Sequence, residues 1–431
     1  MALPNTSDTS LFQRYRNEFG LLIAIFCVLA FTTVISDSYR EFPRQNAVTI
    51  VREIALLGIF ALGAGIVIIA GGIDLSSGSV IAFSGMIFCS VCLLLSPKVG
   101  GTTDPETMST WMQILPRPDA VPQTDQLPVW VLIVAFLVTM LAAFLVGSFH
   151  AWLITAIELP PFVATLASLV GLRSLAKLLI QDVTQIAYAS KTRKSTITIT
   201  DPLFSSLGNS WWIPALIFVL LAIALRVMMS KTVVGRHLYA LGGNEQATRL
   251  SGIRTERLKW LAYCIGSMTA ALAGILYTCY VGTSEPTRDG AGYELNAIAA
   301  SVVGGCSLTG GAGSVLGIVL GSAFLKVVID SVAKSFESRP DLVEGLVVGV
   351  LVVLAVAFNE LRGGRGLKKH FFPGKLGILN VFILTILAGV ISFATAGSDQ
   401  KLRNGIIAAA VTLILLSIRA IMERRSAPRA S

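Results

Sequence analysis

Asp74 is the residue of this sequence whose type and position most clearly suggest chemistry. This carboxylate lies in the nine-residue stretch Gly71–Ser79 (GGIDLSSGS), between an apolar run that ends at Ala70 and another that begins at Val80. A charge at membrane depth costs about 2.5–3.5 kcal/mol even on a lenient insertion scale, so such residues usually face a protein interior or a water-filled cavity. The surrounding glycines and serines favour irregular backbone, which survives at that depth only when buried in protein or lining a cavity.

Three interpretations of this stretch stay open: a plain turn between two helices at the bilayer surface, a break in helix packing, and a functional element beside a translocation path. The candidate residues for the third are Gly71, Gly72, Asp74, Ser76 and Gly78. The topology inferred below puts the stretch toward the cytoplasmic ends of two spans. We therefore expect a hinge or inner gate rather than direct contact between Asp74 and a solute.

The composition excludes a soluble domain. Of the 431 residues, 54% are hydrophobic and only 14% are charged, and the mean hydropathy is +0.74, as expected for a polytopic membrane protein. The six cysteines lie in or beside apolar runs, where Cys behaves as a small hydrophobe. The three histidines are scattered, and no acid/base, nucleophile or metal constellation is visible. We expect no catalytic residue, no metal and no other cofactor, which excludes a membrane enzyme.

Apolar runs of about 20 residues, the length of a membrane helix, predict an all-α polytopic fold with about ten core spans and a C-terminal extension of two more. The segment 160–180 carries Arg173 and Lys177, and 294–306 is short, so either could be re-entrant or half-spanning. The predicted spans fall near 20–36, 51–70, 77–95, 129–149, 160–180, 212–229, 258–280, 294–306, 313–330, 342–358, 377–395 and 404–421.

The basic residues orient these spans. With the N-terminus inside, alternation puts the basic stretches Lys231–Lys259, Arg362–Lys375 and Arg419–Arg429 in the cytoplasm, as the positive-inside rule requires. This arrangement accounts for most of the net charge of +9 without a nucleic-acid partner. The cluster KTRK at 191–194 is an exception, because alternation places it outside.

The cytoplasmic connection Lys231–Lys259 contains the signals of a short helix. Asn244 suits the N-cap, Glu245 the first turn and Gly252 the C-cap. Its apolar face is too small to anchor it alone, so we expect it to dock against a partner, with a solvated loop as the alternative. No GxxxxGK[ST] sequence occurs, so any ATP would be bound by another subunit. The expected coupling residues are Gly243, Asn244, Glu245, Ala247, Leu250 and Gly252.

Two short segments, one in each half of the chain, are weakly similar in sequence. GGIDLS at 71–76 reappears as GGCSLT at 304–309, without the carboxylate. Paired Gly-interrupted segments in the two halves of a transporter indicate its substrate path, although chance similarity between two glycine-rich turns is the alternative.

Four motifs in order resemble the permease subunits of bacterial ABC importers for ribose, galactose and related sugars. They are GGIDLSSGS at 71–79, PPFVATLASLVGLRSLA at 160–176, ALGGNEQATRLSGI at 240–253 and GYELNAIAASVVGGCSLTGGAGSVLG at 292–317. The resemblance covers roughly residues 20–358. It implies a multi-pass protein of the bacterial inner membrane, a second permease subunit, a cytoplasmic ABC ATPase subunit that receives the segment 244–252, and an extracytoplasmic sugar-binding protein.

The resemblance also assigns candidate residues for the path or gate. Besides the glycines and Asp74 of the first motif, these are Phe162, Thr165 and the later glycine cluster Gly304, Gly305, Gly310 and Gly311. Asn296 is a further candidate because of its own chemistry. Asn296 offers a neutral hydrogen-bond partner to a hydroxylated solute. Arg173 and Lys177, which share a helical face, are expected either to snorkel to the outer interface or to line the path. Lys326 and Asp330 are expected to form an interfacial pair.

The expected organisation is a cytoplasmic tail over 1–19, a permease core over 20–358 with a coupling loop at 231–257, a basic linker over 359–376, and an extra transmembrane hairpin with a cytoplasmic tail over 377–431. Members of the family usually stop soon after the position of Phe358, so the hairpin departs from the pattern. The rival function is a secondary transporter of a small polar solute, in which Asp74 would bind the coupling ion.

Overall fold

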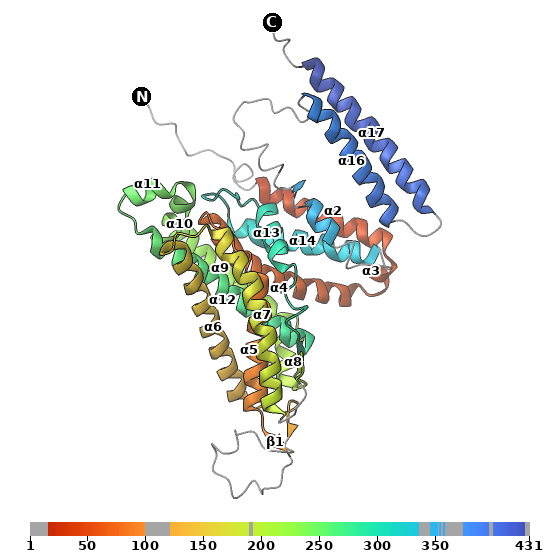
Figure 1. Ribbon diagram of the computed structural model, residues 1–431. Helices are drawn as coiled ribbons and strands as arrows, with labels where there is room; N and C mark the ends of the chain where they lie inside the picture. The colour runs from red at the N-terminus through yellow and green to blue at the C-terminus, as the bar shows by residue number, and fades with distance from the viewer. Residues whose placement is uncertain are drawn as a thin grey trace, which may run out of the picture. The chain divides into compact units, whose positions relative to one another are not determined.

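The computed structural model describes residues 16–99, 121–188, 193–335, 345–351, 353–354, 357, 374–395 and 400–426. Contacts divide the chain into two compact units, one holding α2 to α14 and the other α16 and α17 (Figure 1). The expected tail 1–19 and linker 359–376 lie mostly outside the described residues.

The described elements are helices and two small antiparallel ribbons. The ribbons pair β1 (Lys98–Val99) with β2 (Val121–Pro122) and β3 (Ile197–Thr198) with β4 (Thr283–Ser284). The helices are α2 (Arg16–Ile35), α3 (Asp37–Glu41), α4 (Pro43–Ile69), α5 (Ser77–Leu95), α6 (Val129–Thr155), α7 (Pro161–Ala187), α8 (Pro202–Asn209), α9 (Trp212–Lys231), α10 (Val233–Gly243), α11 (Glu245–Leu250), α12 (Thr255–Val281), α13 (Tyr293–Val303), α14 (Val315–Ser335), α16 (Gly374–Thr395) and α17 (Lys401–Ser426).

The predicted all-α polytopic fold is confirmed. Within the described ranges, nine helices are long and apolar enough to cross a membrane, and α16 contributes a shorter apolar stretch, Leu379–Ala394. The two segments that the sequence left open, 160–180 and 294–306, differ in helix length. α7 is one continuous helix of 27 residues, whereas α13 has only 11 residues and rises roughly 16 Å, about half the hydrocarbon thickness. Of the expected span at 342–358, the structure describes residues 345–351, 353–354 and 357, and all of these are helical.

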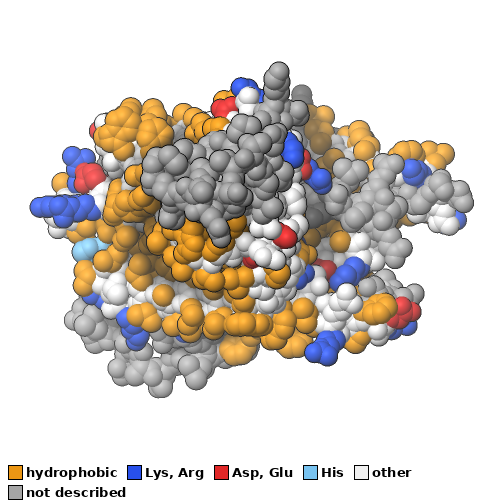
Figure 2. Space-filling model, turned by 90° about the horizontal axis from the view of Figure 1, so that it is seen from below, with side chains coloured by type: hydrophobic (Ala, Val, Ile, Leu, Met, Phe, Trp, Pro, Cys, Tyr) orange, Lys and Arg blue, Asp and Glu red, His pale blue; other side chains and the backbone are white. Residues whose placement is uncertain are grey.

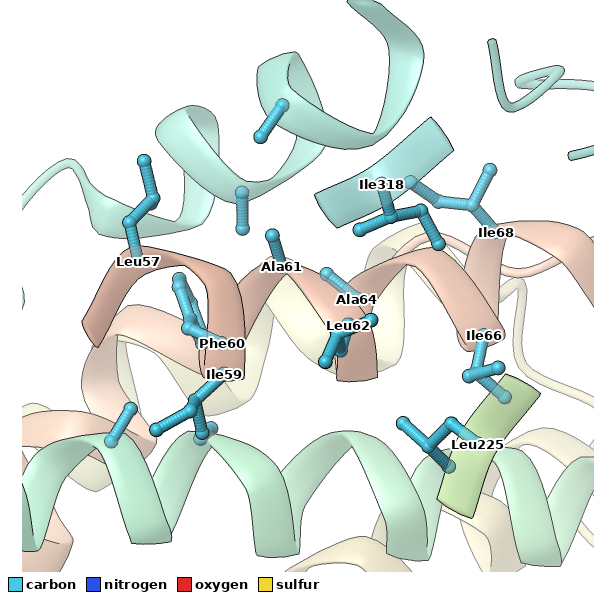
Figure 3. Packing of buried hydrophobic residues seen from close by; sticks show 14 of the residues in the cluster. Leu57, Ile59, Phe60, Ala61, Leu62, Ala64, Ile66, Ile68, Leu225 and Ile318 are labelled. Atoms are coloured by element: carbon cyan, nitrogen blue, oxygen red, sulfur yellow. The ribbon is translucent and has the colours of Figure 1, made fainter. Parts of the chain in front are cut away.

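α4 is the helix around which the first unit packs. Most of its C-terminal two-thirds is buried, with Ile59, Leu62 and Ile66 fully enclosed by neighbouring helices (Figure 3). Lipid tails are as apolar as leucine, so close packing rather than hydrophobicity holds such helices together. Gly58, Gly63 and Gly65 let neighbouring helices pack closely against α4, because a Cβ on each would lie within 2.4 Å of a side chain of another helix.

α6 shows how lipid-facing and packed surfaces are separated. Leu137, Leu141 and Leu145, spaced four residues apart, are each more than half exposed, and hydrophobic side chains cover much of the surface seen in Figure 2. The opposite face of α6 is buried and carries small residues such as Ala143 and Gly147. Small residues at the contact let helix backbones approach closely in a membrane.

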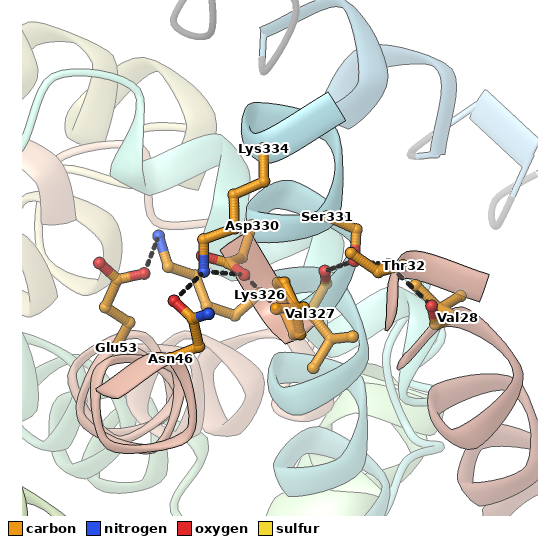
Figure 4. A network of polar contacts seen from close by, with 10 residues as sticks. Val28, Thr32, Asn46, Glu53, Lys326, Val327, Asp330, Ser331 and Lys334 are labelled. Atoms are coloured by element: carbon orange, nitrogen blue, oxygen red, sulfur yellow. Dashed lines mark hydrogen bonds and ion pairs between the residues drawn. The ribbon is translucent and has the colours of Figure 1, made fainter. Parts of the chain in front are cut away.

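A polar network joins α14 to α2, α3 and α4, and it corrects the expected pairing of Lys326 with Asp330. Lys326 instead forms an ion pair with Glu53 at 3.1 Å, while Asp330 pairs with Lys334 at 2.9 Å and accepts a hydrogen bond from Tyr39 (Figure 4). The pairing follows from proximity in space, because α4 and α14 lie side by side.

The Glu53–Lys326 pair provides a test of this packing. Breaking a fully buried pair by removing one partner costs about 3–5 kcal/mol, because the remaining charge is left unpaired. Both side chains are less than about a quarter exposed, so we expect a smaller but clear loss for Glu53→Gln or Lys326→Met alone. The double variant, which leaves no charge, should recover most of the lost thermal stability in detergent. Equal losses in the double and single variants would show that the pair does not stabilise the fold.

Candidate functional site

The stretch Gly71–Ser79 forms a helix end, a turn and a helix start. α4 ends in a Schellman motif: Gly71 has a positive φ of 84°, its N–H bonds the Ile68 carbonyl at 2.9 Å, and the Gly72 N–H bonds the Val67 carbonyl at 2.9 Å. Only glycine adopts this conformation without steric cost. The first half of the motif thus stops one helix and redirects the chain.

Asp74 starts the next helix. Its Oδ1 accepts hydrogen bonds from the Ser76 N–H at 2.9 Å and the Ser76 hydroxyl at 2.5 Å, and the Ser77 hydroxyl bonds the Asp74 carbonyl at 3.0 Å. These local bonds stabilise the turn before α5. Asp74 is 3% exposed, so its carboxylate is not open to a passing solute, which favours the hinge interpretation.

The PFVATL motif lies against the same turn. The Thr165 hydroxyl, fully buried on α7, is 3.2 Å from the Ile73 carbonyl and 2.9 Å from the Pro161 carbonyl. Phe162, by contrast, is about half exposed. Thr165 thereby attaches α7 to the turn, whereas Phe162 lies on the surface of the subunit.

The later glycine cluster repeats the helix end seen at Gly71. Gly305 has a positive φ of 94°, and bonds from the Gly305 and Cys306 N–H groups to the Val302 and Ser301 carbonyls, both 2.9 Å, form a second Schellman motif at the end of α13. In these two helix ends Gly71 matches Gly305, whereas the sequence comparison of GGIDLS with GGCSLT pairs Gly71 with Gly304. The structural match is therefore shifted by one residue. Sequence alone could not choose between adjacent glycines.

Glycines from three Gly-Gly pairs meet where the end of α4, the end of α10 and the loop after α13 come together. The Gly71 Cα would be 2.7 Å from a Cβ placed on Gly310, and the Gly242 carbonyl would be at the same distance from it. The Gly311 N–H donates to the Ile69 carbonyl at 2.9 Å. We call Gly71, Gly242, Gly310 and Gly311 the glycine junction. Gly242 was not among the candidate residues, although its place in a Gly-Gly pair was the available signal.

The junction connects to the coupling segment. α11 is capped as predicted, with the Asn244 Oδ1 accepting from the Ala247 N–H at 2.9 Å and Gly252 at a positive φ of 80°. Glu245 forms an ion pair with Lys259 at 2.5 Å. Leu250 is 89% exposed. In Figure 1, α11 and β1 lie at opposite ends of α5, α6 and α12, so the coupling segment occupies one end of the first unit.

The N-terminus of α13 faces α5. A Cβ on Gly78 would lie 2.0 Å from the Glu294 Oε2, so this glycine makes room for the carboxylate. Arg173 donates to the carbonyls of Pro286 at 2.9 Å and Asp289 at 3.0 Å, which places its guanidinium against the turn before α13. Burial raises the pKa of the Asp289 carboxyl, in that turn, to about 6.

The structure brings together some predicted residues and separates others. Gly71, Gly72, Asp74 and Ser76 belong to one turn, in which all but Gly71 are buried, and Thr165 of α7 lies against it. Asn296 is half-buried on α13, and Gly304 packs against Gly317 of α14. Among the described residues, no three His, Cys, Asp or Glu side chains are grouped to hold a metal ion.

Within the described residues, nine helices able to cross a membrane, two helix ends of the same glycine geometry and the exposed, capped helix α11 are features of a membrane permease. The chain belongs to the family described as the permease component of branched-chain amino acid transport systems, which matches residues 46–356. It is a multi-pass protein of the bacterial inner membrane and a translocation component of the ABC importer type.

Similar curated proteins agree with this assignment. The chain is 30% identical to a ribose import permease of Haemophilus influenzae, over 74% of this chain and 87% of the relative. It is 31% identical to an autoinducer 2 import permease of Photorhabdus laumondii, over 72% and 79%, and 26% identical to a xylose transport permease of Escherichia coli, over 78% and 90%. No solved structure matches the chain.

Gly242 and Gly243 form a matched pair for testing the junction. A Cβ at Gly242 would lie 2.0 Å from the Ile69 carbonyl oxygen and 2.5 Å from the Gly311 nitrogen, whereas at Gly243 nothing lies within 4 Å. We expect Gly242→Ala to lower the melting temperature in detergent by several degrees, since overpacking costs about 1–3 kcal/mol. Gly243→Ala should leave it nearly unchanged. Equal melting temperatures for both variants would contradict the close backbone contact.

Proposed function

We propose that this chain is the membrane-spanning subunit of an ATP-driven importer of a monosaccharide or similar hydroxylated solute. The observation that carries the proposal is the exposed, capped helix α11 at one end of a permease whose sequence contains no phosphate-binding loop. Similar proteins are named as permeases for ribose, xylose and autoinducer 2, and these names support a monosaccharide or similar hydroxylated compound as the solute.

ATP hydrolysis is assigned to a separate cytoplasmic subunit that α11 contacts. Leu250 supports this role because a side chain with 89% exposure on a helix of six residues has no structural use within the subunit. Ala247 is also exposed, and both lie on the side away from the buried Thr248. Burial of such an apolar pair against a partner would contribute favourably to association.

The energy reaches the gate through the glycine junction. α10 ends at Gly243, directly before the coupling segment, and Gly242 contacts the backbone of both broken-helix turns. A displacement of α11 by its partner would therefore move Ile69, Gly71 and Gly310, because Gly242 contacts their backbones directly and no side chain separates them. Gly72, Asp74, Ser76 and Gly78 act as the hinge of an inner gate in this proposal.

The solute path is proposed to run along α5, α7 and α13, next to Phe162, Thr165, Asn296, Gly304 and Gly305. Asn296 would offer an amide to solute hydroxyls. A second permease subunit completes the path on the exposed side of these helices, and an extracytoplasmic binding protein delivers the solute. The lipid bilayer surrounds the remaining apolar surface, including the exposed leucines of α6.

Leu250 provides the experiment. Leu250→Glu should reduce co-purification of the ATPase subunit at least tenfold, because it places a charge in an apolar contact. Leu250→Met keeps an apolar side chain of similar size and should retain the ATPase. Membrane insertion and melting temperature of both variants should match the parent chain, since Leu250 makes few contacts within it. Normal ATPase recovery with Leu250→Glu would remove the main support for the proposal.

A further inference from the structure

Four buried polar side chains are grouped behind the Gly71–Ser79 turn, and no role has been assigned to three of them. They are Asp74 in the turn, His150 on α6, and Tyr263 and Ser267 on α12; each is at most 3% exposed. The Asp74 Oδ2, both His150 ring nitrogens, the Tyr263 hydroxyl and the Ser267 hydroxyl have no hydrogen-bond partner within the described part of the chain. We call these four residues the buried polar cluster.

The cluster is held close to the carboxylate by contacts with glycines. A Cβ on Gly266 would lie 3.7 Å from the Asp74 Oδ2, and one on Gly72 would lie 2.5 Å from the Tyr263 hydroxyl. The His150 and Tyr263 rings meet edge to face with centroids 6.4 Å apart.

Two parts of the cluster differ in their freedom to move. α6 and α12 are in backbone contact one turn from His150, because a Cβ on Gly147 would lie 2.7 Å from the Cys264 Cα. His150 and Tyr263 are therefore fixed relative to each other. Asp74 lies instead in the turn between α4 and α5, which is the proposed hinge, so its Oδ2 can approach or leave the imidazole as that turn moves.

Buried polar groups normally find partners, and an unpaired group in a native protein needs an explanation. A neutral imidazole offers one donor and one acceptor, whereas a protonated imidazole offers two donors, and a carboxylate only accepts. One added proton would thus let His150 donate to the free Asp74 oxygen, forming a charge-assisted hydrogen bond in a site closed to water. Tyr263 can donate to the same oxygen.

We propose that Asp74, His150 and Tyr263 form a proton-binding site that holds the inner-gate turn against α6 and α12 when the proton is bound. The proton comes from solvent during gate movement and resides on His150, paired with the Asp74 carboxylate. Loss of the proton releases the turn. Solute transport therefore slows at acidic pH and accelerates as the pH rises.

The groups around His150 support this assignment. Tyr263 of α12 meets the His150 ring edge to face, and Cys264, the next residue of α12, is engaged with the Ser148 hydroxyl at 3.5 Å. From α7, the Thr165 hydroxyl contacts the Ile73 carbonyl of the turn and does not titrate in this range. No positive side chain from these elements competes for the Asp74 oxygen in the described residues.

The inference rests on the proposed function, and the test separates the two. ATP-driven uptake of labelled ribose or xylose by the reconstituted complex is measured between pH 5.5 and 8.5. The parent complex should show at least a threefold rise over this range. His150→Asn, which keeps a hydrogen-bonding side chain without a titrating one, should flatten the profile, and His237→Asn on α10 should leave it as in the parent. An unchanged profile in His150→Asn would overturn the inference; absence of ATP-driven uptake at every pH would instead count against the proposed function.

A second readout does not depend on transport. Histidine C2 hydrogen exchange, followed by mass spectrometry on the purified complex, reports the pH midpoint of His150 directly. In Asp74→Asn, where the negative partner is removed, we expect the midpoint to move to lower pH by one unit or more. An unchanged midpoint would show that the two groups do not share a proton, whether or not His150→Asn assembles.

Discussion

The backbone contact at the glycine junction is the constraint on which the rest of this permease depends. Within a bilayer, an irregular backbone segment survives only if other protein groups satisfy its N–H and C=O groups. The Gly311 N–H donates to the Ile69 carbonyl across two segments more than 200 residues apart in sequence. A Cβ at Gly242 would lie 2.0 Å from the Ile69 oxygen and 2.5 Å from the Gly311 nitrogen, so the end of α4, the end of α10 and the loop after α13 can meet only because glycine occupies the contact positions.

The two broken helices have the same end but different continuations. After Gly71 the chain carries Asp74, whose carboxylate organises the start of α5, whereas Leu308 occupies the corresponding position after Gly305. One turn is therefore stabilised by hydrogen bonds to a buried carboxylate, and the other by backbone bonds and the contact between the Ser307 and Thr309 hydroxyls. In the proposed transport cycle the first turn moves and the second supports it.

Much of the fold could be predicted from the sequence because hydropathy and helix caps are local signals. The spans, the short α13 and the caps at Asn244 and Gly252 all follow from neighbouring residues. Arg173 illustrates what could not be predicted, because its partners are carbonyls more than 110 residues away. His150 appeared only as one scattered histidine, since its proximity to Tyr263 arises from the Gly147 contact between α6 and α12.

The measurement that tests the central claim most directly is solute uptake into proteoliposomes that contain the chain with its co-purifying ATPase, at equal pH and ion concentration on both sides. The account predicts that labelled ribose or xylose accumulates only when ATP is supplied on the ATPase side and the binding protein on the other, and that protonophores have no effect. Accumulation without ATP, driven by an imposed proton or sodium gradient, would contradict it.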